Sequence, residues 1–251
     1  MSGHSHWATI RRKKGAADAK KGQIFTRLAR EIVLAARDGG GDPGLNVRLQ
    51  LAIDRARAQN MPKDNIERAI KRGTGESKDG GSLEEVMYEG YAGNGVAVLI
   101  DCVTDNRNRA VSEIRHVLSK HGGNMAEAGS VSWQFKRAAV FSFPVEGKDQ
   151  DEIFELAVEA GADDVTFEDG SAEIVGPVET FKAISDALKA SGIQPEDAGL
   201  KMIPTNEVEL SADETMQVLR TLEALEDLDD VQDVYSNLRL TEEMLSQIEE
   251  A

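Results

Sequence analysis

Lysine and arginine residues near the N-terminus are the side chains whose type and spacing most suggest chemistry. A run of four cations occupies residues 11–14, and Lys20, Lys21 and Arg27 follow at short intervals. Cations at this density neutralise backbone phosphates, and the indole of Trp7 could approach a base or sugar. We predict phosphate contacts, with His4 and Trp7 as secondary contacts, from Arg11, Arg12, Lys13, Lys14, Lys20, Lys21, Arg27, Arg30, Lys63, Lys71 and Arg72.

The net charge of the whole chain argues against a nucleic-acid partner. The charge of its separate segments does not. The 251 residues include 29 Lys and Arg against 45 Asp and Glu, a formal net charge of −16. Residues 1–80 carry +8, residues 81–137 carry −1 and residues 138–251 carry −23. A basic run is often only a solvated surface, but the overall composition of an acidic chain does not account for this one. The gradient therefore favours a binding role for the first segment.

A second basic stretch follows an apolar run that ends near residue 103. Arg107 and Arg109 stand there beside the amide side chains of Asn106 and Asn108, which can donate hydrogen bonds to phosphates. Asp105 or Asn106 could equally serve as the cap of the helix that follows. We predict Arg107 and Arg109 as secondary nucleic-acid contacts and leave the capping alternative open.

Catalytic, metal and cofactor chemistry find little support in the sequence. His4 and His6 lack cysteine or carboxylate partners at ligand spacing, and Cys102 lies inside an apolar run typical of a core strand. Neither a nucleophile elbow nor a glycine-rich phosphate loop occurs, and the acidic residues of the last third follow the polar faces of helices. We predict no catalytic residue, no metal site and no cofactor.

The first segment has the apolar spacing of helices. Residues repeat at three and four positions over 20–37 and 45–56, and a third helix starts at Pro62 and ends at Gly73. In the first helix one face should pack while the opposite face is cationic. A polar, glycine-rich linker covers residues 73–82, so we predict a basic helical nucleic-acid-binding domain over residues 1–80.

Beyond the linker, strands and helices alternate. We predict helices over 107–120, 150–160, 178–190, 212–225 and 241–250, and strands over 96–103, 130–135, 139–143, 165–167, 172–175, 199–203, 207–210 and 231–235. The run 138–204 spells βαββαβ, and its removal leaves a second βαββαβ. We therefore predict an α+β protein of three domains, in which one ferredoxin-like module is inserted into another.

The predicted boundaries follow from this division. A split α/β domain covers residues 81–136 plus 206–251, and an acidic α/β domain covers residues 137–205. The alternative treats the connection from Phe135 to Ala139 as a hairpin within one continuous sheet. The sequence leaves these two pairings open.

The composition predicts a cytoplasmic location. The longest apolar run, Val96 to Ile100, is far shorter than a membrane span, and the N-terminus lacks the apolar stretch of a secretory signal. A single cysteine suits a reducing compartment.

Several motifs resemble those of the YebC family. They are SGHS followed by Trp7 and Ala8, GQIFTRLAREI, GGGDP, NMPKDNIERAIKRGTGE, YEGY, GVAVLIDCVTDNRNRAVSEIRHVLSKHGGN and GSVSWQF. The similarity runs along nearly the whole chain. It implies a helical N-terminal domain followed by two α/β domains.

The resemblance also implies a role in gene expression. Bacterial members are known as probable DNA-binding transcriptional regulators, mitochondrial relatives as translational activators, and a ribosome-associated role in relieving stalling is a further implication. We therefore expect a non-enzymatic, nucleic-acid-binding regulator. The alternatives are a translation factor that contacts ribosomal RNA or the ribosome, and a scaffold that binds protein partners through its acidic α/β domains. No membrane partner is expected.

Overall fold

A computed structural model describes the backbone of residues 19–76, 83–168 and 170–241 and the side chains from residue 22 onward within these ranges. Three helices come first: α2 (Ala19–Gly39), α3 (Val47–Ala58) and α4 (Lys63–Gly73). Asn46 joins the first two, since its side chain accepts a hydrogen bond from the backbone N–H of Leu49 and donates to the carbonyl of Ala35 at 2.7 Å. The predicted helices are confirmed.

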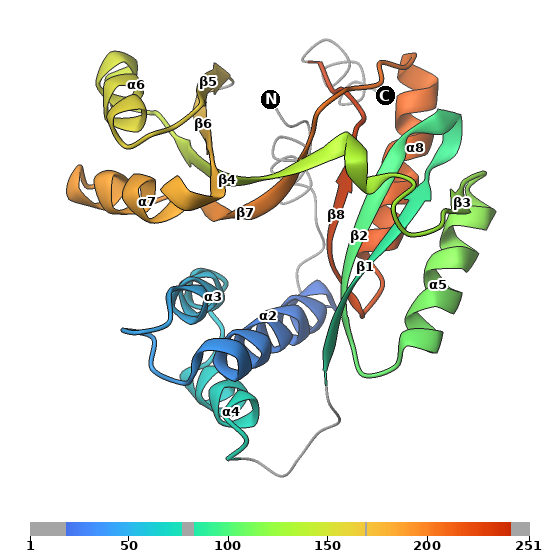
Figure 1. Ribbon diagram of the computed structural model, residues 1–251, viewed down its shortest axis with the longest axis horizontal. Helices are drawn as coiled ribbons and strands as arrows, with labels where there is room; N and C mark the ends of the chain where they lie inside the picture. Colours follow the sequence, from blue (N-terminus) through green and yellow to red (C-terminus); the bar gives the residue numbers. More distant parts are fainter. Residues whose placement is uncertain (1–18, 77–82, 169, 242–251) are drawn as a thin grey trace.

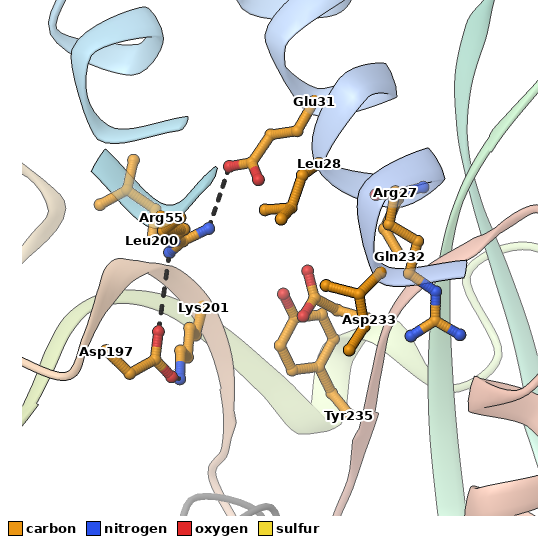
Figure 2. Close-up of a pocket in the computed structure, with 11 residues that line it drawn as sticks. Arg27, Leu28, Glu31, Arg55, Asp197, Leu200, Lys201, Gln232, Asp233 and Tyr235 are labelled. Atoms are coloured by element: carbon orange, nitrogen blue, oxygen red, sulfur yellow. Dashed lines mark hydrogen bonds and ion pairs between the residues drawn. The ribbon is translucent and has the colours of Figure 1, made fainter. Parts of the chain in front are cut away.

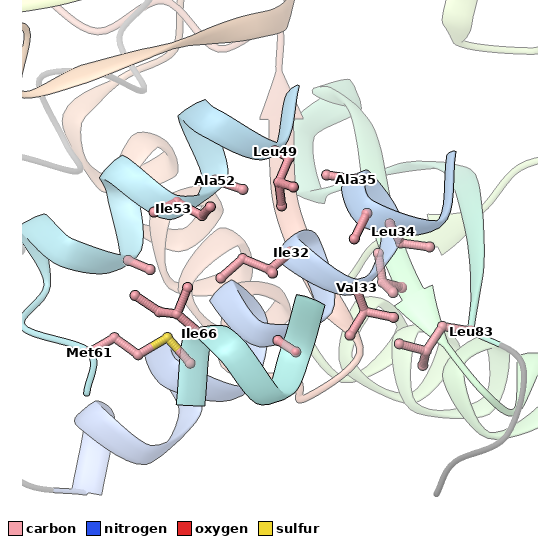
Figure 3. Packing of buried hydrophobic residues seen from close by; sticks show 14 residues of the cluster. Ile32, Val33, Leu34, Ala35, Leu49, Ala52, Ile53, Met61, Ile66 and Leu83 are labelled. Carbon is pink, nitrogen blue, oxygen red and sulfur yellow. The ribbon is translucent and has the colours of Figure 1, made fainter. Parts of the chain in front are cut away.

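The helix α2 is buried more completely than a one-sided amphipathic helix. Its residues from Ile32 to Ala36 are all at most 7% exposed, so the expectation of one packed and one free face fails in the second half of the helix. The reason is that α3, α4 and the neighbouring sheet enclose it. Figure 3 shows Leu49 and Met61 on the helical side and Leu83 on the sheet side of this core.

The first sheet has the strand order β3-β1-β2-β8, with antiparallel pairing throughout. Helices α5 and α8 cover the face that lies away from α2 (Figure 1). The bounds are β1 (Glu84–Tyr91), β2 (Ala97–Thr104), α5 (Arg107–Lys120), β3 (Asn124–Met125), α8 (Ala212–Glu226) and β8 (Val231–Ser236), with a short 3-10 turn at Gly93–Gly95.

The second sheet has the order β5-β6-β4-β7 and is also antiparallel. Helices α6 and α7 pack against its buried face, where Phe141 and Phe181 stack with ring centroids 4.8 Å apart. The element order predicted for 138–204 is observed. The bounds are β4 (Phe135–Pro144), α6 (Gln150–Glu159), β5 (Asp164–Glu168), β6 (Ser171–Gly176), a 3-10 turn (Val178–Thr180), α7 (Phe181–Ala190) and β7 (Asp197–Pro204).

The first sheet corrects the predicted second module. Residues 130–135 are not a strand, because they contain a 3-10 turn at Ser132–Gln134, and β1 from upstream takes the expected place beside β2. Strand β1 is hard to recognise in the sequence because it contains a charged residue, Glu89, at a buried position. Its carboxylate is buried and accepts backbone hydrogen bonds from Gly129, Val131 and Ser132.

Two smaller predictions also change. The hairpin alternative at Phe135 to Ala139 is wrong, because this stretch is part of the uninterrupted strand β4, whose first residues pair with Pro204 and Ile203. The strand predicted over 207–210 is reduced to one isolated bridge between Val208 and Leu238. The terminal helix predicted over 241–250 lies outside the described residues. In the described parts of the chain, no helix is long and apolar enough to cross a membrane.

Candidate nucleic-acid interface

The predicted contact residues fall into three groups. Arg11, Arg12, Lys13 and Lys14, together with His4 and Trp7, lie outside the described residues. Lys20 and Lys21 belong to the first turn of α2, but their side chains are not described. The structure places the remaining predicted cations. They differ in whether an acidic side chain of the fold already pairs with them.

A groove of about 390 Å³ lies between α2 and α4, and arginines line it. Arg30 comes from α2, while Arg68 and Arg72 come from α4. The α4 residues stand four positions apart and therefore share one face of the helix, with Asn65 on the same face. We call the set of Arg30, Asn65, Arg68 and Arg72 the α2/α4 groove. Asp105 lines the same cavity.

Arg68 and Arg72 differ from most other arginines of the molecule. Within the described residues neither has an ion-pair partner, and Arg68 is exposed. Two like charges at this spacing repel one another and destabilise an isolated helix by a few tenths of a kcal/mol. An anionic ligand in the groove would remove that cost. Arg68 was missed at the sequence level, although its spacing from Arg72 is a signal that could have found it.

The backbones of α2 and α4 meet closely at the end of the groove. A Cβ atom built on Gly73 would lie 2.7 Å from the Cβ of Ala36 and would also collide with the carbonyl of Val33. Real Cβ atoms do not approach other atoms this closely, so only glycine allows this crossing. The relative position of the arginines on the two helices therefore depends on this residue.

Two predicted cations meet at one buried carboxylate. Asp230 is 1% exposed and lies 3.1 Å from Arg30 and 2.8 Å from Arg109, while the hydroxyl of Thr104 donates to it at 2.9 Å. Hydrogen bonds to Asp230 and Asp105 raise the pKa of Arg109. This network ties α2 and α5 to the residue that precedes β8. It also leaves Arg30 less available to an external phosphate, since only 16% of its side chain is exposed.

The other placed residues have local partners or caps. Lys63 lies 3.5 Å from Glu67, and Arg107 pairs with Glu84. The capping alternative is confirmed at Asn106, whose side chain accepts a hydrogen bond from the backbone N–H of Arg109. Lys71 is exposed on α4 and has no ion-pair partner within the described residues.

A second group of arginines lies where α2, α3, β7 and β8 meet. Arg55 donates to Glu31 at 3.0 Å and to the carbonyl of Ala198, and it lies 3.9 Å from Asp197 (Figure 2). Arg27 and Tyr235 line the same crevice. Burial raises the pKa of Glu31, while the nearby Arg55 lowers it, and burial has the larger effect. We call this region the junction crevice.

An acidic pair borders the junction crevice. Asp101 and Asp233 stand directly opposite each other on the antiparallel strands β2 and β8. Burial and then the charge of Asp233 raise the pKa of Asp101 to about 7, and burial raises the pKa of Tyr235 as well. Like charges across a strand pair are destabilising. Arg48 and Arg137 lower the pKa of Asp101 and so offset part of this repulsion.

The described parts of the chain offer neither a metal site nor a reactive thiol. No group of three or more His, Cys, Asp and Glu side chains there could hold a metal ion. Cys102 is fully buried in β2, as predicted, and burial raises the pKa of its thiol to about 12. A thiol with such a pKa is a poor nucleophile at neutral pH.

Comparison with known proteins identifies the class. Residues 5–76 match the domain described as the TACO1/YebC protein N-terminal domain, and residues 83–238 match the TACO1/YebC second and third domain. This chain belongs to the TACO1/YebC family.

Relatives of similar length share about half of its residues. A probable transcriptional regulatory protein from Acidithiobacillus ferrooxidans is 51% identical over 249 residues, which cover 99% of both chains. One with the same description from Rubrobacter xylanophilus is 48% identical and covers 99% of both chains. The crystal structure of a conserved hypothetical protein from Aquifex aeolicus superposes with a TM-score of 0.86 at 43% identity, covering 96% of this chain and 99% of that one.

Proposed function

We propose that this chain is a non-enzymatic, cytoplasmic regulator of gene expression that binds the phosphate backbone of a nucleic acid through its first 80 residues. We further propose three domains: the basic helical domain, a split α/β domain of residues 81–136 and 206–251, and an inserted acidic domain of residues 137–205. The net negative charge of the two α/β domains would repel a phosphate backbone and so orient the basic domain toward the ligand.

The α2/α4 groove is the observation that carries this proposal. Arg68 and Arg72 share one helix face, line a cavity with Asn65 and Arg30, and have no carboxylate partner of their own within the described residues. A phosphate between them would accept charge-assisted hydrogen bonds, which are the stronger kind. The cations at 11–14, Lys20 and Lys21 extend the same charge along the chain, and Lys71 adds to it on α4.

The names of the relatives and the form of the groove point to different nucleic acids. The relatives are called transcriptional regulators, which favours DNA as the partner. The arginines, however, line a groove shared by two helices, with Arg30 on α2 and Arg68 and Arg72 on α4. A helix that reads the major groove instead projects its own side chains into it. This arrangement supports a single or irregular strand, as in ribosomal RNA, and so favours the translation-factor alternative.

A protein-binding role for the acidic domains rests on a separate observation. Phe154 and Val158 on α6 are 49% and 50% exposed and stand four residues apart on a helix rich in acidic side chains. Capture of a basic protein partner by variants that no longer bind nucleic acid would favour this second function.

The test of the main proposal is a double variant, Arg68→Ala with Arg72→Ala. We expect affinity for a nucleic acid to fall by about 10- to 100-fold, because two charge-assisted contacts are lost. The slope of log affinity against log salt should flatten by about 1.4 to 1.8. Titrations of labelled duplex DNA, single-stranded DNA and RNA of one sequence measure both quantities and rank the targets.

The matched control removes the same charge elsewhere. Arg115→Ala with Arg220→Ala changes two exposed arginines on α5 and α8, outside the first 80 residues, and its affinity and salt slope should stay close to those of the parent. Equal losses in the two double variants would mean that net charge alone governs binding, and the groove assignment would then be wrong.

A further inference from the structure

An exposed tryptophan occupies a rigidly held turn between β3 and β4. The side chain of Trp133 is 69% exposed, the most exposed aromatic side chain in the described residues. Its indole N–H donates to the carbonyl of Ser130 at 2.9 Å, which fixes the orientation of the ring. A ring that is held in one orientation and open to solvent is available to stack on a partner.

The turn is held from its N-terminal side by a buried carboxylate. Glu89 on β1 is 8% exposed and accepts hydrogen bonds from the backbone N–H groups of Gly129, Val131 and Ser132 at 2.7, 2.6 and 2.9 Å. Burial would raise the pKa of Glu89, but the three backbone donors together lower it. The side chain of Val131 is fully buried beside Leu99. The segment before Trp133 therefore has little freedom.

The residue on the other side of Trp133 is held just as firmly. Gln134 is 8% exposed, and its side-chain oxygen accepts a hydrogen bond from the amide of Asn237 at 3.1 Å. Its backbone carbonyl accepts hydrogen bonds from the backbone N–H and the hydroxyl of Thr205, at 2.8 and 2.9 Å. The backbone on both sides of Trp133 is thus held in place, so little conformational entropy would be lost if a partner bound there.

The charge of the chain segment that contains Trp133 suggests the kind of partner. Residues 128–145 contain Lys136 and Arg137 and no aspartate or glutamate, although residues 138–251 as a whole carry −23. Lys136 is exposed, and its Cα atom lies at most about 11 Å from that of Trp133, because three residues of extended chain reach no further. A base stacked on the indole would place its own phosphate within reach of this lysine.

We propose that Trp133 is a stacking site for an unpaired base of a single-stranded nucleic acid, with Lys136 on the adjacent phosphate. This inference rests on the proposed function and extends it, because it adds a contact on the α/β part of the chain, outside the N-terminal helical domain. Bases stack on aromatic rings irrespective of their sequence, so the site adds affinity for unpaired strands and not recognition of one sequence.

The first measurement uses Trp133 as its own reporter. The chain has two tryptophans, so in the full-length Trp7→Phe protein all tryptophan emission comes from Trp133. Addition of a single-stranded 20-nucleotide RNA, or DNA of the same sequence, should quench this emission. A duplex of that sequence should quench it much less, because paired bases are not free to stack. Unchanged emission at saturating single strand would overturn the inference.

The second measurement compares the affinities of variants made in the Trp7→Phe protein, which serves as the parent. Trp133→Ala should weaken single-strand binding by about 5- to 100-fold with an unchanged salt slope, because stacking but no phosphate contact is lost. Trp133→Phe should keep most of the affinity. The control Phe154→Ala truncates another exposed aromatic residue, on α6, and should bind like the parent. Thermal melting checks that each variant is folded.

The two proposals fail in different ways. If Trp133→Ala binds like the parent while the Arg68 and Arg72 double variant does not, the stacking site is wrong and the proposed function stands. If the parent binds neither single strand nor duplex, the proposed function fails and this inference fails with it.

Discussion

The α2/α4 groove and the junction crevice both contain several arginines, yet they differ in what those arginines contact. In the junction crevice Arg55 binds Glu31, and nearby Arg48 pairs with Asp38 and Glu85 at 3.1 and 2.9 Å. In the groove Arg68 and Arg72 have no such partner within the described residues. The difference teaches that the number of cations in a region does not locate a binding site. Their pairing within the fold does.

The largest effect should come from the junction crevice. Arg55→Ala removes the charge that compensates Glu31, and we expect the free energy of unfolding to fall by about 3 kcal/mol. Arg68→Ala should change it by no more than about 0.5 kcal/mol, because no internal partner is lost. Chemical denaturation of the two single variants measures both values. Similar losses of stability in the two would remove the distinction between the regions.

A smaller effect is expected from the helix crossing beside the groove. Gly73→Ala places a methyl group against Ala36 and Val33, so α2 and α4 must separate, at a cost of about 2 kcal/mol. Because the arginines on the two helices then move apart, nucleic-acid affinity should fall as well. Gly75→Ala is a useful comparison, since its added Cβ would meet no neighbouring atom, although its φ of +79° makes the substitution strained. Thermal unfolding and the same titration test this, and unchanged affinity in a destabilised Gly73 variant would show that the groove tolerates repositioning.

The smallest effect concerns the acidic pair and depends on pH. Because Asp101 has a pKa of about 7 in the folded protein against 3.8 in the reference state, the folded form binds a proton more tightly. This group therefore lowers stability as pH rises from about 4 through 7. The Asp101 side chain is only partly buried, so solvent screens much of this penalty. Asp101→Asn should therefore stabilise the protein by about 1 kcal/mol at pH 8 and hardly at all at pH 4. Denaturation curves at the two pH values decide, and an equal gain at both would argue against a charge effect.

The sequence predicted local structure well where neighbouring residues determine it. The helix predicted over 107–120 is observed with the same ends, because Asn106 caps it and its apolar spacing is regular. Strand β1 was missed because Glu89 looks unsuited to a buried position. Its carboxylate is satisfied by backbone groups about 40 residues away, and no local pattern announces such partners.

The candidate site shows the same limit. Arg30 and Arg109 looked alike as free cations, and the structure joins both to Asp230, which is far from them in sequence. Arg68 belongs to the groove only because α2 lies across from it. Charge and helical spacing predicted which segment is basic. Which cations stay available depends on the packing of distant elements, and that information is not local.

The hydrogen bonds between Gln134 and Thr205 have a consequence for how this architecture could arise. They hold the chain together at the two points where it leaves the first sheet and returns to it. Residues 135–204 therefore form a 70-residue insertion whose two ends lie in contact. Holding these ends together costs the first sheet and its helices only the entropy of closing a loop, which grows slowly with loop length. The second sheet and its helices are thus an insertion between Gln134 and Thr205. Its gain, loss or exchange during evolution would leave the path of the other strands and helices unbroken.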